Sequence, residues 1–112
     1  MITSTENAEH YIWGAQCDGW HLLKSNTLSV IQERMPPATG EQLHYHHHAQ
    51  QVFYILAGIA TFEVDGELKT VSANQSIHIL PGVKHRILNN NDVDLCFLVI
   101  SEPKAHGDRV NL

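Results

Sequence analysis

The chain has 112 residues, of which 43% are hydrophobic and 17% charged, and its formal net charge is −5 with histidine neutral. This length suits one compact domain with its own core, and the negative charge disfavours nucleic acid and anionic membrane surfaces as partners, since both select basic patches. The opening residues MITSTENAEHYIW lack the basic and apolar regions of a secretory signal, and no apolar run approaches the roughly 18 residues of a membrane-spanning helix.

Cysteine usage favours a cytoplasmic location. The chain has two cysteines, Cys17 and Cys96. Without an export signal, such a pair is typical of free buried thiols in a cytosolic protein, with a disulfide as the alternative. Histidine is the compositional outlier, with nine residues in the chain.

The first predicted strands follow an N-terminal arm. We expect residues 1–19 to form this arm, and residues 13–25 to contain its end and a short strand. Residues 27–35, TLSVIQERM, alternate between two faces, are rich in strand-forming residues and end at Pro36. One face of this strand carries Leu28, Val30, Gln32 and Arg34, and the other carries Ser29, Ile31, Glu33 and Met35.

The remaining elements are also short strands. Asp65 and Gly66 predict the turn of a β-hairpin because both tolerate positive φ. Residues 95–101, LCFLVIS, form a continuous apolar run that predicts a fully buried strand, and residues 102–112 form a polar tail. About eight short strands at turn spacings of about 8 to 12 residues indicate a sandwich or small barrel. The other predicted strands are 41–46, 51–58, 59–64, 67–72, 77–80 and 85–88.

Two of the clustered histidines share one strand face. In an extended strand, residues i and i+2 point to the same side, so His44 and His46 lie together. Two imidazoles placed in this way can hold one metal ion, provided that other ligands come from elsewhere. His85, which follows a Pro-Gly turn, is a candidate third ligand, and Gln51 at the start of the next strand is a candidate fourth.

These segments resemble the two motifs of the cupin superfamily. The first motif has a His-x-His pair, an acidic ligand after four residues and a glycine after six more, matched here by His44-Tyr45-His46, Gln51 and Gly58. The second has Pro-x-Gly-x-x-His with an asparagine four residues later. It is matched by Leu80-Pro81-Gly82-Val83-Lys84-His85 and Asn89. This chain departs from the pattern at four positions, which are Gln51 in place of the acid, Leu80 in place of the proline, Asn74 where a glycine is usual and Gly40 one position off.

The resemblance implies an all-β, single-domain cupin over residues 1–112, a double-stranded β-helix or jelly-roll barrel of the RmlC-like type. It implies one divalent transition metal ion (Mn, Fe, Ni, Zn or Cu) inside the barrel, and a homodimer. Because Gln51 does not neutralise charge as a glutamate would, the ion keeps its full charge, favours an anionic ligand and is held less tightly. The alternative is a cupin that has lost its metal. The metal ligands implied by the resemblance are His44, His46, Gln51 and His85.

Other residues are candidates for the pocket or for contacts behind the ligands. His47 and His48 fall in the loop between ligands and are expected to face solvent. His78 is either a base or support for the ligands, or a structural histidine, and Arg34 points either into the barrel or into solvent. We expect Phe53 and Phe62 to line an apolar pocket with Ile55, Phe97 and Val99. Trp13 and Trp20 cover a barrel mouth, a partner subunit or the core.

Function is less determined than fold, because one fold hosts many activities. The first hypothesis is a metal-dependent oxygenase, isomerase or lyase that acts on a compact anionic or enolisable small molecule. The alternative is a non-catalytic module that binds or senses a small ligand through the metal. A structural barrel without a ligand is the third possibility. The catalytic residues and the reaction are not identified by the sequence.

Overall fold

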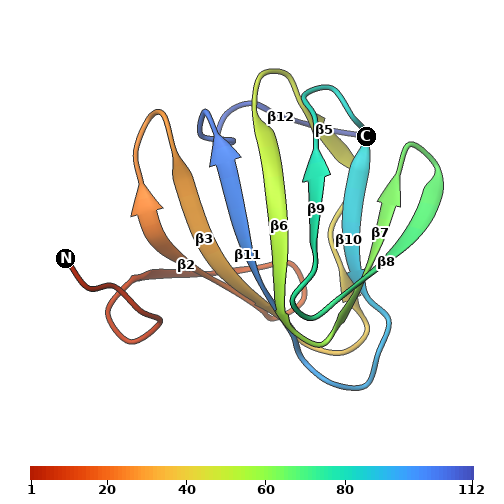
Figure 1. Cartoon of the computed structure of the whole chain (residues 1–112), viewed down its shortest axis with the longest axis horizontal. Helices are drawn as coiled ribbons and strands as arrows, with labels where there is room; N and C mark the ends of the chain where they lie inside the picture. Colours follow the sequence, from red (N-terminus) through yellow and green to blue (C-terminus); the bar gives the residue numbers. More distant parts are fainter.

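The computed structural model describes all 112 residues and contains twelve β-strands and no helix, which confirms the all-β prediction. Figure 1 shows the strands side by side around a common interior, with the N-terminal hairpin on one side and the hairpin of β7 and β8 on the other. The structure therefore also contains no helix that is long and apolar enough to cross a membrane. The first six strands are β1 (Glu9–Trp13), β2 (Cys17–Lys24), β3 (Ser29–Met35), β4 (Thr39–Gly40), β5 (His44–His46) and β6 (Gln50–Ala57). The last six are β7 (Ile59–Val64), β8 (Glu67–Ser72), β9 (Ser76–Ile79), β10 (His85–Asn89), β11 (Leu95–Glu102) and β12 (Arg109–Asn111).

The strands form two antiparallel sheets. Sheet A has the order β1-β2-β3-β11-β6-β9, and sheet B has the order β12-β5-β10-β7-β8, with β4 also paired to β10. Neighbours in each sheet come from distant parts of the chain, as when β11 inserts between β3 and β6. This connectivity brings the histidine strand β5 against β10, which begins at His85.

The hairpin predicted at residues 59–72 is present. Asp65 and Gly66 have φ angles of 49° and 83°, so both occupy the left-handed region that the turn requires. Asn74 also has a positive φ of 68°. Asparagine tolerates this conformation better than other non-glycine residues, so its presence where glycine is usual leaves the turn intact.

The prediction that β11 is buried on both faces is wrong. The side chains of this strand alternate between buried and half-buried. The reason is that each antiparallel sheet of a two-sheet fold has one face inside and one face outside. The core lies between the sheets and is built from residues such as Phe53, Ile55, Phe62, Phe97 and Val99.

Both ends of the chain join the sheets. Residues 1–19, expected as an arm, contain β1 and the start of β2, which pair as a hairpin at the edge of sheet A. In the expected tail, β12 pairs with β5 and places Arg109 opposite His46. Cys17 and Cys96 are free thiols, as predicted, although Cys96 is only partly buried.

Candidate metal centre

Three histidine side chains meet between β5 and β10. His44 and His46 point inward from β5, and His85 lies directly opposite His44 at the start of β10. All three residues are buried, with at most 5% of each exposed. One ring nitrogen from each histidine lies within 4.8 Å of the others, a grouping that can hold one metal ion.

Backbone carbonyl groups orient two of the imidazole rings. Nδ1 of His44 lies 2.8 Å from the carbonyl oxygen of Gln42, and Nδ1 of His85 lies 2.9 Å from that of Val83. A neutral imidazole that donates from Nδ1 carries its free lone pair on Nε2. These contacts therefore leave Nε2 as the metal-binding atom of both rings, which is the usual support for a histidine ligand.

The surroundings keep the histidines neutral. Burial lowers the pKa of His44 to about 3 and that of His46 to about 4. The pKa of His85 is lowered as well, again chiefly by burial. Metal ions bind the deprotonated ring nitrogen, so the cluster has the charge state of a metal site at neutral pH.

Gln51 completes the donor set from β6. Its Oε1 lies 3.2 Å from Nε2 of His85, and its Nε2 donates to Oγ of Ser101 at 3.0 Å. Because His85 donates from Nδ1, two lone pairs face each other across 3.2 Å. Nδ1 of His46 is also buried without a hydrogen-bond partner. The separation of 3.2 Å fits a cation shared by Nε2 of His85 and Oε1 of Gln51, since two ligand atoms each about 2.1 Å from one ion are separated by about 3 Å when they bind at right angles.

The remaining candidates lie in different places. His47 and His48 are exposed in the loop after β5, as expected. Phe53 lines the cavity beside the histidines, while Phe62 is fully buried in the core and does not. Trp13 packs against the core.

Arg34 and His78 lie outside the cavity. Arg34 forms ion pairs with Asp18 and Asp94, and Nε2 of His78 lies 2.9 Å from Oε1 of Gln50. The alternation in β3 therefore turns Glu33 inward and Arg34 outward. The direction of Arg34 could not be read from the sequence, because residues 36–40 interrupt the alternation between this strand and the histidine strand.

The cavity differs in character from the expected apolar pocket. It has a volume of about 680 Å³, and only five of its 21 lining residues are hydrophobic. Glu33, Glu41 and Arg109 line it together with His44, His46 and Gln51. None of these three residues was a predicted site residue. For Glu33 there was a signal, because it shares a strand face with Ile31 and Met35.

Burial also alters two of the three carboxyl groups that line the cavity, those of Glu33 and Glu41. It raises the pKa of Glu33 to about 8, with a further contribution from the nearby charge of Glu41. It raises the pKa of Glu41 to about 7, although the positive charge of Arg109 and a hydrogen bond from the Ile87 amide oppose the rise. At neutral pH Glu33 is therefore mainly protonated, and Glu41 is divided between its two forms.

Comparison with known proteins gives a family match over most of the barrel. The family model described as the cupin domain matches residues 31–101, which is more than half of the chain. An uncharacterized protein of Methanocaldococcus jannaschii is 29% identical over 89 residues, 79% of this chain and 71% of that protein. Mannose-1-phosphate guanylyltransferase of Escherichia coli is 32% identical over 59 residues, 53% of this chain but only 12% of that enzyme.

Solved structures share the fold at low sequence identity. An RmlC-like cupin from Shewanella frigidimarina superimposes with a TM-score of 0.84 at 20% identity, covering 94% of this chain and 92% of that one. A predicted oxalate decarboxylase from Thermotoga maritima gives 0.83 at 23% identity, covering 93% and 100%. The polyketide cyclase RemF from Streptomyces resistomycificus gives 0.86 at 15% identity, covering 100% and 84%.

Proposed function

The chain belongs to the cupin family, and on that basis we propose that it binds one divalent transition metal ion through His44, His46, His85 and Gln51. We further propose that the metal-loaded barrel acts on a small anionic or enolisable molecule, as an oxygenase, isomerase or lyase. The observation that carries this proposal is the convergence of three neutral, buried imidazoles with an amide oxygen, beside a cavity that His44, His46 and Gln51 line. Nitrogen and oxygen donors of this kind suit Mn, Fe, Ni, Cu or Zn.

The charge balance of the site favours an anionic ligand. When bound, a divalent ion supplies Lewis acidity, which stabilises negative charge on a coordinated oxygen. None of the four donor groups carries a charge that would offset it. Glu33 and Glu41 lie in the same cavity, but their raised pKa values reduce their negative charge near pH 7. Arg109 adds a positive charge to the cavity lining.

The activities named for two proteins of similar fold support an enzyme. A predicted oxalate decarboxylase and a polyketide cyclase are built on the same barrel. The substrate class that fits this site is a compact carboxylate or enolate. The alternative is a non-catalytic module that binds a small ligand through the metal. Binding without turnover by the metal-loaded protein would support this alternative.

Metal analysis of purified variants tests the ligand assignment. We expect about one metal ion per wild-type chain and a loss of most of it in His46→Ala and His85→Ala, because each change removes a buried donor. His47→Ala is the matched control, since His47 is exposed on the adjacent loop and should retain the metal. Equal loss in His47→Ala would show that the ligands are assigned in the wrong register.

Gln51→Glu extends this metal test. The carboxylate adds a negative charge beside the ion, so metal should dissociate more slowly from the variant. The Ser101 hydroxyl, which accepts from Gln51 Nε2 in the wild type, can rotate to donate to the new carboxylate. Gln75→Glu is the control, because Gln75 lies in the exposed turn before β9 and its Oε1 accepts from the Ser72 amide. Unchanged retention in Gln51→Glu would place Gln51 outside the metal ligands. Turnover of diketones, hydroxy acids or sugar phosphates by the loaded protein would then separate an enzyme from a binding module.

A further inference from the structure

Tyr11 reaches across a neighbouring strand to contact Glu33. In sheet A, Tyr11 on β1 pairs with Gly19 on β2, and Gly19 pairs with Glu33 on β3, so the three residues form one row. A Cβ atom at Gly19 would overlap the ring of Tyr11. Because Gly19 has no side chain, the ring lies over β2, and its hydroxyl donates to Oε2 of Glu33 at 3.0 Å.

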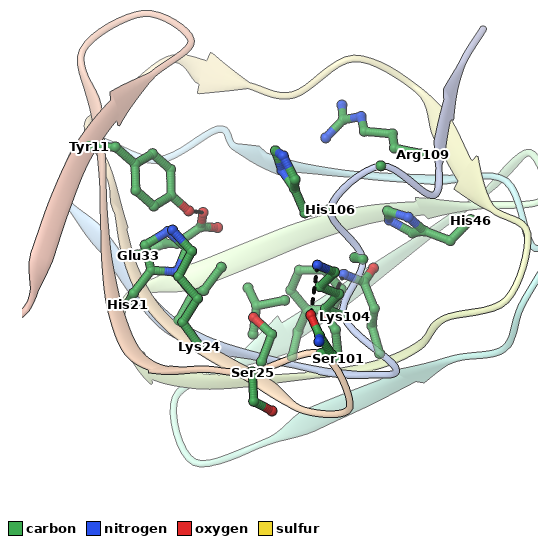
Figure 2. A pocket seen from close by; sticks show the side chains of 18 of the residues that line it. Tyr11, His21, Lys24, Ser25, Glu33, His46, Ser101, Lys104, His106 and Arg109 are labelled. Atoms are coloured by element: carbon green, nitrogen blue, oxygen red, sulfur yellow. Dashed lines mark hydrogen bonds between the residues drawn. The ribbon is translucent and has the colours of Figure 1, made fainter.

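Glu33 presents an unused carboxyl oxygen to the cavity. Its hydrogen bond from Tyr11 occupies Oε2, while Oε1 accepts no hydrogen bond from the protein. Both residues line the cavity that also contains His44, His46 and Gln51. Figure 2 shows Tyr11, Glu33 and His21 together on one side of this cavity, with His46 and Arg109 on the other side and His106 between the two groups. A molecule in the cavity therefore lies between the histidine cluster and this pair.

The pair is uncharged at neutral pH. Burial and the neighbouring Glu41 raise the pKa of Glu33, and burial beside Glu33 raises the pKa of Tyr11. His21 stacks on the ring of Tyr11 with a centroid separation of 5.1 Å, and burial lowers its pKa, so it also favours the neutral form. Arg109 opposes the rise at Glu33. A protonated carboxyl group can donate its proton in a hydrogen bond as well as accept one.

We propose that Tyr11 and Glu33 form a second binding subsite, which hydrogen-bonds an uncharged hydroxyl or carbonyl oxygen of the same molecule whose anionic group binds at the histidine cluster. The ligand class is then a hydroxy- or oxo-carboxylate with the two groups at opposite ends. This inference rests on the proposed function, because the metal end fixes the anionic group. It adds a specificity determinant at the other end of the cavity.

A series of straight-chain ω-hydroxycarboxylates tests the subsite, each compared with the unsubstituted carboxylate of equal length. Calorimetric titration of metal-loaded protein should show an affinity advantage for the hydroxyl compound that peaks at one chain length. At that length we expect at least a fivefold advantage, about the contribution of one neutral hydrogen bond. A hydroxyl group at the far end does not chelate the metal, so the advantage reports on the distal contact.

Variants assign the advantage to the pair. Glu33→Met removes the carboxyl group from a side chain of similar length, and Tyr11→Phe removes only the hydroxyl group. Both should reduce the ratio of the two affinities toward one while leaving the affinity for the unsubstituted acid nearly unchanged. Gln32→Met is the matched control, because Gln32 is adjacent on β3 with its side chain on the opposite face. Tyr11→Phe keeps the test valid if Glu33→Met does not fold.

The possible failures are distinct. Equal affinities for both compounds at every length, with binding that requires the metal, would overturn the second subsite and leave the proposed function standing. A hydroxyl advantage that persists in both Glu33→Met and Tyr11→Phe would also overturn it. If neither compound binds to the metal-loaded protein, both the anion-binding pocket and the subsite are contradicted.

Discussion

Glu33 shows how a single side chain acquires unusual chemistry from its position. Its carboxyl group is buried beside Glu41 and receives one hydrogen bond, from Tyr11. If this group ionised, its negative charge would be shielded from water and would have too few hydrogen-bond donors to stabilise it. The proton is therefore retained over a pH range in which an exposed glutamate is ionised.

This retention predicts how the stability of the metal-free protein varies with pH. The unfolded chain loses the Glu33 proton near pH 4.5, while the folded protein holds it to about pH 8. The folded state binds more protons in this window, so the free energy of unfolding falls as pH rises through it. Glu33→Gln keeps an acceptor for Tyr11 but does not titrate. We expect urea unfolding to show that wild type loses about 2 to 3 kcal/mol more than this variant between about pH 5 and pH 8.

The comparison isolates Glu33 from its neighbours. The raised pKa of Glu41 contributes to the pH dependence of both proteins and largely cancels in the difference. Glu6→Gln is the control, because it removes an exposed carboxylate near the N-terminus. Parallel stability curves for wild type and Glu33→Gln would show that Glu33 ionises in the folded state as it does in the unfolded chain.

At the scale of elements, a glycine sets how closely β6 and β7 approach β11. Gly58 connects β6 to β7 with a φ of 87°, and a Cβ atom there would lie 2.8 Å from the backbone oxygen of Asp94. Backbone atoms cannot move away as the end of a flexible side chain can. The glycine of the first motif therefore has both a conformational and a steric role in this fold.

Alanine substitution separates these two roles. Gly66 in the β7–β8 turn has a similar φ of 83° but no atom within 4 Å of its added Cβ. We expect Gly66→Ala to lower the free energy of unfolding by about 1 to 2 kcal/mol, the cost of a left-handed backbone. Gly58→Ala should cost at least about 1 kcal/mol more, because the steric contact is added. Equal losses in urea unfolding would mean that the segment near Asp94 relaxes without cost.

At the scale of the whole molecule, the two sheets leave edge strands. β1 and β9 end sheet A, and β12 and β8 end sheet B. Exposed edges invite pairing with other chains, and a closed two-fold dimer is a common way to cover them. Ile12 on the edge strand β1 is 66% exposed, so this edge presents a large apolar side chain to solvent.

We expect a homodimer that uses the β1 edge. Light scattering at micromolar concentration should give twice the mass of the chain, and Ile12→Lys should shift the protein toward monomer because an edge lysine disfavours strand pairing. Leu68→Lys is the control on β8, where the side chain is 70% exposed on the other sheet. A monomer mass for wild type would contradict the dimer, and equal effects of the two substitutions would contradict the choice of edge.

The sequence by itself determined most of the strands, several of their turns and the candidate residues of the histidine cluster, but it did not predict β1, β4 or β12. Hairpin residues 59–64 and 67–72 were predicted with the bounds that the structure shows. Alternation with a period of two and the φ preferences of Asp65 and Gly66 are local properties, so they can be counted directly along the chain. The shared face of His44 and His46 follows from the same alternation. His85 and Gln51 were further candidates from the sequence, and the resemblance to the cupin motifs joined all four into one ligand set.

Only the tertiary structure decided which face of each strand is inside and what the cavity contains. The alternation along β3 places Glu33 and Arg34 on opposite faces, but residues 36–40 interrupt the pattern, so the sequence did not show which of the two faces points inward. The reach of Tyr11 over Gly19 depends on the register of three strands. The pairing of β12 with β5 joins residues far apart in the chain. These features depend on pairing between distant strands, which a local pattern does not encode, and for this reason the polar character of the cavity emerged only from the fold.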